Sequence, residues 1–179
     1  GLTNNANGTV NFINAGHTIG TFTNATSTSV LNISALITSA SAINTLTATA
    51  AGNTVNYSGS GDQTVKNTTY SNLTVSGSGT KTLNGGTTVT GVLTLTNGVL
   101  STTTYNLLSI TNTATSAISG GSATAYINGP VSWTLPPSLG SGSTYVFPVG
   151  KSGSYKPFSL VNPTTGTGTT TVQVEAFAT

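Results

Sequence analysis

Apolar and polar residues alternate over short stretches along most of this chain. Clear stretches run from Thr54 to Tyr57, Asn72 to Val75, Val92 to Leu95 and Leu107 to Ile110, and clusters of Gly, Asn and Ser separate them. Alternation with a period of two is typical of strands with one buried face, and such clusters form turns. The apolar spacing of an amphipathic helix is not sustained anywhere. The pattern predicts an all-β protein.

Apolar positions also recur at a nearly constant interval. One row has equal steps and consists of Ile19, Ile37, Val55 and Leu73. A second row has nearly the same step and consists of Leu46, Val65, Leu83, Leu100 and Ile118. Two rows of one period are expected if each unit is one coil of a stack, whereas strand and loop lengths vary in a sandwich. We therefore predict a parallel β-helix-like solenoid with about 18 residues per coil. An Ig-like or jelly-roll sandwich is the alternative.

The composition changes near residue 129. All six prolines lie between Pro130 and Pro163, and the single tryptophan, Trp133, lies there too. We predict two parts: solenoid repeats over residues 1–128, and a small β-sandwich or hairpin module over residues 129–179 that serves as a cap or connector. Its last strand is expected from Thr171 to Phe177, where apolar residues alternate.

Charged residues make up only 3% of the 179 residues. The six are Asp62, Glu175, Lys66, Lys81, Lys151 and Lys156. A typical soluble domain has about 25% charged residues, so most acid–base, metal-binding and phosphate-binding chemistry lacks its usual side chains. We predict a non-catalytic protein with no catalytic, cofactor-binding or metal-binding residues and no cofactor. Four scattered lysines do not form the basic patch that nucleic acid needs. No apolar run is long enough to predict a membrane span.

Isolated ionisable residues are candidates for sites only if partners lie near them. His17 is the only histidine and has no Cys or carboxylate near it in the sequence, so a solitary polar or packed side chain is expected. A β-helix polysaccharide-degrading enzyme would need two acids in one cleft, yet Asp62 and Glu175 are far apart in the chain. Lys156, Asn162 and Glu175 are candidates for an isopeptide bond, although exposed charges at a sheet edge are the plainer interpretation.

Aromatic residues gather in the C-terminal part. Trp133, Tyr145 and Tyr155 could stack on a sugar and are the candidate glycan contacts, together with Phe147 and Phe158 nearby. The same cluster is also expected as the core of a small β module, which is the commoner role of such residues.

Thr-x-Thr pairs raise the hypothesis of an ice-binding face, which requires the pair on every coil. With nearly equal steps, Thr45 and Thr47 are followed one coil later by Thr64 and Lys66, and then by Thr82 and Asn84. A lysine in this row disfavours ice binding.

The middle of the chain resembles the Thr- and Gly-rich repeats of large secreted bacterial surface proteins and adhesins. The similar segments are residues 70–77 (YSNLTVSG), 79–83 (GTKTL) and 89–100 (VTGVLTLTNGVL). Residues 145–150 (YVFPVG) with 155–157 (YKP) are similar to a segment that often follows such repeats in proteins exported by type IX secretion. The resemblance implies an extracellular β-solenoid at the bacterial cell surface without inherited catalytic residues. The first residue, Gly1, is not Met, so a mature or excised form is expected.

These observations lead to a structural role as the expected function. We expect a building block of an extracellular fibre, filament or adhesin stalk that pairs through β-strands with other copies of itself or with neighbouring segments of a longer chain. The candidate junction residues are Val10, Phe12, Ile13, Val172, Val174 and Phe177. The alternative is an adhesin module that binds surface glycans through the C-terminal aromatic cluster.

Overall fold

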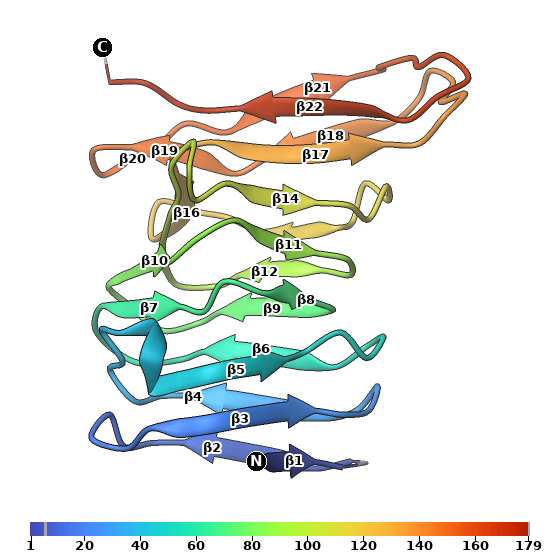
Figure 1. The fold of residues 1–179 in the computed structure, drawn as a ribbon. Coiled ribbons are helices and arrows are strands. Elements are labelled where there is room, and N and C mark those ends of the chain that lie inside the picture. Colours follow the sequence, from blue (N-terminus) through green and yellow to red (C-terminus); the bar gives the residue numbers. More distant parts are fainter. Residues whose placement is uncertain (6, 179) are drawn as a thin grey trace.

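The computed structural model describes residues 1–5 and 7–178. The chain winds into a β-solenoid of about seven turns, with the two termini at opposite ends of the stack (Figure 1). The only helical segment among the described residues is the 3-10 helix η1 (Ala40–Ala42). The predicted fold class is therefore confirmed. Ala6 and Thr179, which fall within the predicted solenoid and C-terminal module, lie outside the described residues.

The strands form three faces of the rod. The first face joins two sheets through a parallel bridge between Ala48 and Tyr70. It contains β1 (Leu2–Asn4), β3 (Ile19–Asn24), β5 (Ile43–Thr47), β8 (Thr69–Tyr70), β11 (Thr87–Val89), β14 (Leu108–Ile110), β17 (Val131–Leu135) and β22 (Thr170–Val174). The second face contains β2 (Thr9–Phe12), β4 (Val30–Ile33), β6 (Thr54–Tyr57), β9 (Asn72–Val75), β12 (Leu93–Leu95) and β15 (Ile118–Gly120). The third face contains β7 (Gln63–Val65), β10 (Thr80–Leu83), β13 (Gly98–Ser101), β16 (Ala125–Asn128), β19 (Val149–Lys151) and β20 (Ser154–Tyr155).

The alternation along each strand decides which side chains enter the core. On the second face the inward row is in register from coil to coil and consists of Val10, Leu31, Val55, Leu73, Leu93 and Ile118. The four members between the ends are fully buried, whereas Val10 and Ile118 are half-buried. Each coil thus covers the apolar row of its neighbours, which is the burial that drives folding.

Glycine is required where successive coils approach closely at a corner. Gly98 has φ 90°, and a Cβ on it would lie 2.2 Å from the carbonyl oxygen of Gly77 in the preceding coil. Any larger residue would need both an unfavourable backbone conformation and a displaced neighbour.

The coil length varies more than the apolar rows suggest. Val55 pairs with Leu73, its neighbour in the predicted row, but the step from Gly98 to its partner Ala125 is much longer. Ile19 pairs with Ile43 rather than with Ile37. The evenly spaced rows predicted from the sequence therefore agree with the observed strand register at some positions and not at others. Register is fixed by the inward pattern of each strand, and additional residues are accommodated in the loops at the corners.

Parallel stacking continues beyond the predicted boundary at residue 129. β17 pairs in parallel with β14, and β19 pairs in parallel with β16, so both belong to the solenoid. Antiparallel pairing then closes this end of the rod. β22 pairs with β17, β20 pairs with β19, and β21 (Phe158–Val161) pairs with β18 (Thr144–Phe147). The C-terminal segment is thus a last coil with an antiparallel cap.

Candidate functional site

Two of the three candidate glycan contacts lie in the core. Trp133 and Tyr145 are buried, with 0% and 1% of their surface exposed, and their rings meet edge to face at 5.1 Å between centroids. The Trp133 indole N–H donates to the carbonyl of Asn112 at 2.9 Å, and the Tyr145 hydroxyl donates to the carbonyl of Thr113 at 2.9 Å. Their polar atoms are satisfied and their faces are covered, so neither ring is accessible to a sugar.

The third candidate, Tyr155, is half-buried on β20. Phe147 is buried against Trp133 at 5.3 Å between ring centroids, and Phe158 is 6.0 Å from Phe147. Trp133, Tyr145 and Phe147 thus fill the core beneath the antiparallel cap, which corresponds to the plainer interpretation from the sequence, whereas Phe158 is exposed.

The first coil leaves two strand edges unpaired. Within the described residues, β1 pairs only with β3 and β2 pairs only with β4. Leu2 occupies an inward position opposite buried Phe22, yet 55% of it is exposed because no coil lies below it. Among the candidate junction residues, Phe12 is buried, Val10 is half-buried, and Ile13 is 75% exposed.

At the other end, the cap also carries accessible apolar side chains. Val172 pairs with Trp133 and Val174 pairs with Val131, and both valines are half-buried. Phe177, beyond the end of β22, is 69% exposed. Phe158 and Val161 on β21 are exposed as well.

Large exposed apolar side chains are therefore concentrated near the ends of the rod. Near the N-terminal end they are Leu2, Ile13 and Leu36, and in the last coil and cap they are Val146, Phe158, Val161 and Phe177. Between these groups, Tyr105 is the only one among the described residues. Exposed apolar groups that cluster in this way mark interaction surfaces more often than scattered ones do.

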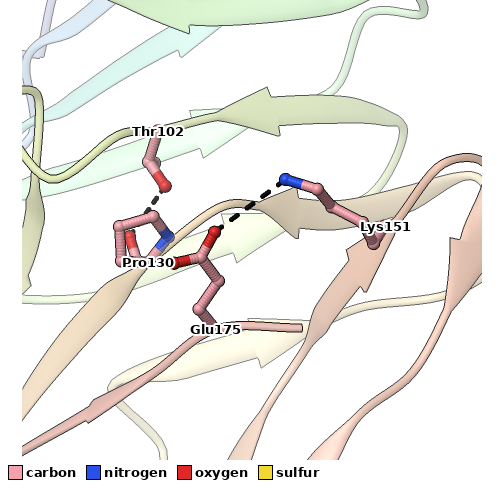
Figure 2. A network of polar contacts seen from close by, with 4 residues as sticks. All are labelled: Thr102, Pro130, Lys151 and Glu175. Atoms are coloured by element: carbon pink, nitrogen blue, oxygen red, sulfur yellow. Dashed lines mark hydrogen bonds and ion pairs between the residues drawn. The ribbon is translucent and has the colours of Figure 1, made fainter. Parts of the chain in front are cut away.

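An ion pair ties the cap to the last coil. Figure 2 shows Lys151 of β19 extended toward Glu175, which follows β22, with 3.8 Å between Nζ and Oε1. Beside this pair, the hydroxyl of Thr102 donates to the carbonyl of Pro130 at 2.7 Å. Glu175 thus pairs with Lys151, whereas the isopeptide hypothesis required it beside Lys156. Both charged side chains are partly exposed, so the pair adds little stability.

Lys81 points inward from β10. It is fully buried, and its Nζ donates to the carbonyls of Gly59, Gly61 and Ser78 at 2.9, 2.6 and 2.6 Å. Burial lowers the pKa of this amine, and the charge of nearby Asp62 partly opposes the shift. The strand alternation could have identified this inward position, because Lys81 lies two residues before buried Leu83.

The remaining ionisable candidates do not come together. His17 is exposed in a loop of the first coil, and Asp62 Oδ1 accepts a hydrogen bond from the backbone N–H of Thr80 at 2.7 Å. Within the described residues, no three His, Cys, Asp or Glu side chains are grouped so that they could hold a metal ion. No pocket is found on the part of the chain that the structure describes.

The first face carries a continuous row of hydroxyl side chains. One outward position is Ser or Thr in all seven coils, and we call this row the hydroxyl column: Thr3, Thr23, Thr47, Thr69, Thr88, Ser109 and Ser132. Its members are exposed or half-buried except Ser132, which is buried and donates to the Ser109 hydroxyl at 3.2 Å.

This register corrects the row used in the sequence argument against ice binding. Thr64 and Lys66 do not follow Thr45 and Thr47, because Thr64 lies on the third face, paired with Thr82. The bridge between Ala48 and Tyr70 instead places Thr69 beside Thr47. The error came from assuming a constant coil length, and Lys66 is not part of the row.

None of the known protein families, curated proteins or solved structures that were searched matches this chain. Among the described residues, no helix has the length and apolar character to cross a membrane.

Proposed function

We propose that this chain is a non-catalytic building block of an extracellular, bacterial cell-surface fibre or adhesin stalk, and that copies associate end to end through β-strand pairing. The observation that carries the proposal is the concentration of exposed apolar side chains and unpaired strand edges at the two ends of the rod. Unpaired edges are templates for another strand, and the apolar side chains beside them add the burial that stabilises such a contact.

The two ends differ, which favours a head-to-tail contact. The N-terminal end offers the outer edges of β1 and β2, whereas the C-terminal end offers the cap strands β22 and β21. β21 and β2 are each four residues long, so they are matched in length for pairing. A contact between two different surfaces at opposite ends of a rod does not close on itself, and repeated contacts of this kind produce a filament.

The scarcity of charge is consistent with stacking of copies. None of the six charged residues lies in a strand of the first or second face. Strands that pair between copies in these faces would therefore not place like charges opposite one another, which would be destabilising.

The glycan-binding alternative retains little support, because two of the three candidate contacts, Trp133 and Tyr145, are covered and only the third, Tyr155, is partly accessible. The degradative-enzyme alternative is also weak. The Asp62 carboxylate accepts a hydrogen bond from the backbone N–H of Thr80, whereas Glu175 forms an ion pair with Lys151 at the cap. The two acids therefore do not share a cleft.

Negative-stain electron microscopy and light scattering of the purified chain over a range of concentrations test the proposal. We expect filaments from the wild-type chain. Ile13→Lys and Phe177→Lys, which place a charge at either end, should abolish them. Tyr105→Lys is the matched control, because Tyr105 is 92% exposed but lies between the ends. Monodisperse rods at the highest concentration, or equal loss of filaments in the control, would contradict end-to-end association.

A further inference from the structure

The hydroxyl column differs from the outward rows of the other two faces in being chemically uniform. The corresponding row of the second face changes from amides to hydroxyls and consists of Asn11, Asn32, Asn56, Thr74, Thr94 and Ser119. On the third face, hydroxyls occupy three coils, at Thr64, Thr82 and Ser101, and the row then continues with Asn128 and Gly150. Only the first face keeps one hydroxyl side chain in the same position in each of the seven coils.

The threonine hydroxyls of this column are available to an external partner. Among the described residues, the side-chain hydroxyls of its five threonines make no hydrogen bond within the protein. On the second face, part of the row is bonded along the rod, because Asn56 donates to Asn32 at 2.8 Å and accepts from Ser76 at 2.8 Å. The five threonines of the first face instead present both a donor and acceptors outward.

A second, shorter row lies two positions further along the strands. Its threonines are Thr49, Thr90, Thr111 and Thr134, whereas the other coils have Asn5, Ala25 and the buried Ser71 in this position. The hydroxyls of Thr90 and Thr111 donate to the carbonyls of Tyr70 and Val89 at 3.2 and 3.4 Å, which orients them and leaves their acceptor positions unused. Together the two rows form a narrow array of methyl and hydroxyl groups.

The spacing of this array is set by the solenoid. Neighbouring strands are about 4.8 Å apart, and side chains two residues apart on one strand are about 6.7 Å apart. Threonine is stiff at χ1 because of its branched Cβ, so the hydroxyls are held in place before any partner arrives. Oxygen atoms on the planes of an ice crystal repeat at distances of the same order. Waters bridging such fixed hydroxyls would therefore lie in positions close to those of a crystal surface.

The residues of the first face indicate which kind of crystalline surface it could bind. Its aromatic residues Phe22, Tyr70 and Trp133 all point inward and are buried, so no ring is available to stack on a crystalline polysaccharide. None of the six charged residues lies in its strands, so it has no strongly hydrated group to hold liquid-like water. We infer that the first face is an ice-binding surface centred on the hydroxyl column. This inference does not depend on the proposed association, which involves the ends of the rod.

A pair of matched substitutions tests the inference. Thr88 and Thr94 are the middle residues of β11 and β12, which are consecutive three-residue strands with the same burial pattern on different faces. Thr88→Tyr places a bulky ring in the hydroxyl column, whereas Thr94→Tyr makes the same change on the second face. Freezing-point depression below the melting point and inhibition of ice recrystallisation are measured for the full chain, and circular dichroism verifies folding.

We expect the wild-type chain to shape ice and to separate its freezing and melting points. Thr88→Tyr should lose this activity, whereas Thr94→Tyr should retain it. If Thr88→Tyr does not fold, Thr69→Lys in the adjacent coil replaces it and should show the same loss. A wild-type chain without ice activity overturns the inference. So do equal losses in both tyrosine variants, full activity in a folded Thr69→Lys variant, or adsorption to crystalline cellulose or chitin in place of ice.

Discussion

Tyr57 and Tyr70 place their phenolic oxygens 3.1 Å apart inside the core, although they come from different faces and successive coils. The backbone N–H of Lys66 donates to the Tyr57 oxygen at 2.9 Å, and the Tyr70 hydroxyl donates to the Lys66 carbonyl. Because the Tyr70 hydrogen is used in this way, the Tyr57 hydroxyl must donate to Tyr70. The pair thus fixes the backbone of the corner that follows β7.

Removal of one of these hydroxyls should destabilise the rod. Tyr57→Phe removes the hydroxyl that accepts from the partly buried Lys66 N–H, and the buried Tyr70 hydroxyl loses the hydrogen bond from Tyr57. We expect the free energy of unfolding to fall by about 1–3 kcal/mol, the usual cost of a buried group without a partner. Urea denaturation measures the change, with Tyr105→Phe as the exposed control. A Tyr57→Phe variant as stable as this control would show that water or local movement satisfies the corner.

The same pair makes stability depend on pH in the alkaline range. Burial raises the pKa of Tyr57, Tyr70 and Tyr145 above the usual value. In the unfolded chain these groups ionise near pH ~10, while the folded chain keeps their protons. The unfolded state then binds fewer protons, so stability should fall as pH rises above about 10. Lys81 acts in the opposite direction, because its lowered pKa means that the unfolded state keeps that proton longer.

Urea midpoints measured across the alkaline range test this assignment. The double variant Tyr57→Phe/Tyr70→Phe should show a shallower decline than the wild-type chain, with the contribution of Tyr145 remaining. An unchanged slope would mean that other groups, or the unfolded state itself, dominate the pH dependence.

Alternation and turn residues made the all-β solenoid predictable, because the inward position of each strand is visible as a single apolar residue. Coil length was not predictable in the same way. Rows at a fixed spacing can pass through residues that lie on different faces, as Leu46 on the first face and Val65 on the third face illustrate. Register depends on how many residues each corner holds, and loop length leaves only a weak signal in a chain rich in Gly, Ser and Thr.

Some of the surface residues could be predicted from the sequence and others could not, because the latter depend on the strand register. Ile13 and Phe177 are junction candidates because they lie near the chain ends beside predicted strands, and both are exposed. Trp133 and Tyr145 are plausible sugar contacts in the sequence, but their burial beneath the cap depends on strand pairing between distant segments. The hydroxyl column could not be found in the same way, because it requires the true register of all seven coils.

Substitution of Lys81 should reveal how the corner beside β10 is held. Lys81→Met keeps much of the volume but leaves the carbonyls of Gly59, Gly61 and Ser78 without their donor. We expect a loss of about 1–3 kcal/mol in unfolding free energy, because the carbonyl of Gly59 stays buried, and those of Gly61 and Ser78 partly buried, while their partner is removed. Lys81→Gln should lose less, since its register partner Gln63 donates to the carbonyls of Ile33 and Ala35 from the same position one coil earlier.

Thermal and urea denaturation compare these variants with Lys156→Met, in which an exposed lysine is replaced. If Lys81→Met proves as stable as the wild-type chain, the cost of burying the ammonium offsets its three hydrogen bonds, as occurs for some buried charges.

The close approach of coils at Gly98 leads to the sharpest local prediction. Its φ of 90° is unfavourable for any residue with a Cβ, and that atom would lie 2.2 Å from the Gly77 carbonyl oxygen. Gly98→Ala should therefore lower the free energy of unfolding by more than about 1 kcal/mol, since substitution at an incompatible φ costs more than the entropy gained in the unfolded chain. Gly140→Ala is the matched control, because nothing lies within 4 Å of a Cβ at that position and its φ is not in the left-handed region. Chemical denaturation measures the unfolding free energy of both variants. If Gly98→Ala is as stable as Gly140→Ala, the third face can shift to admit a methyl group without loss of pairing between β10 and β13.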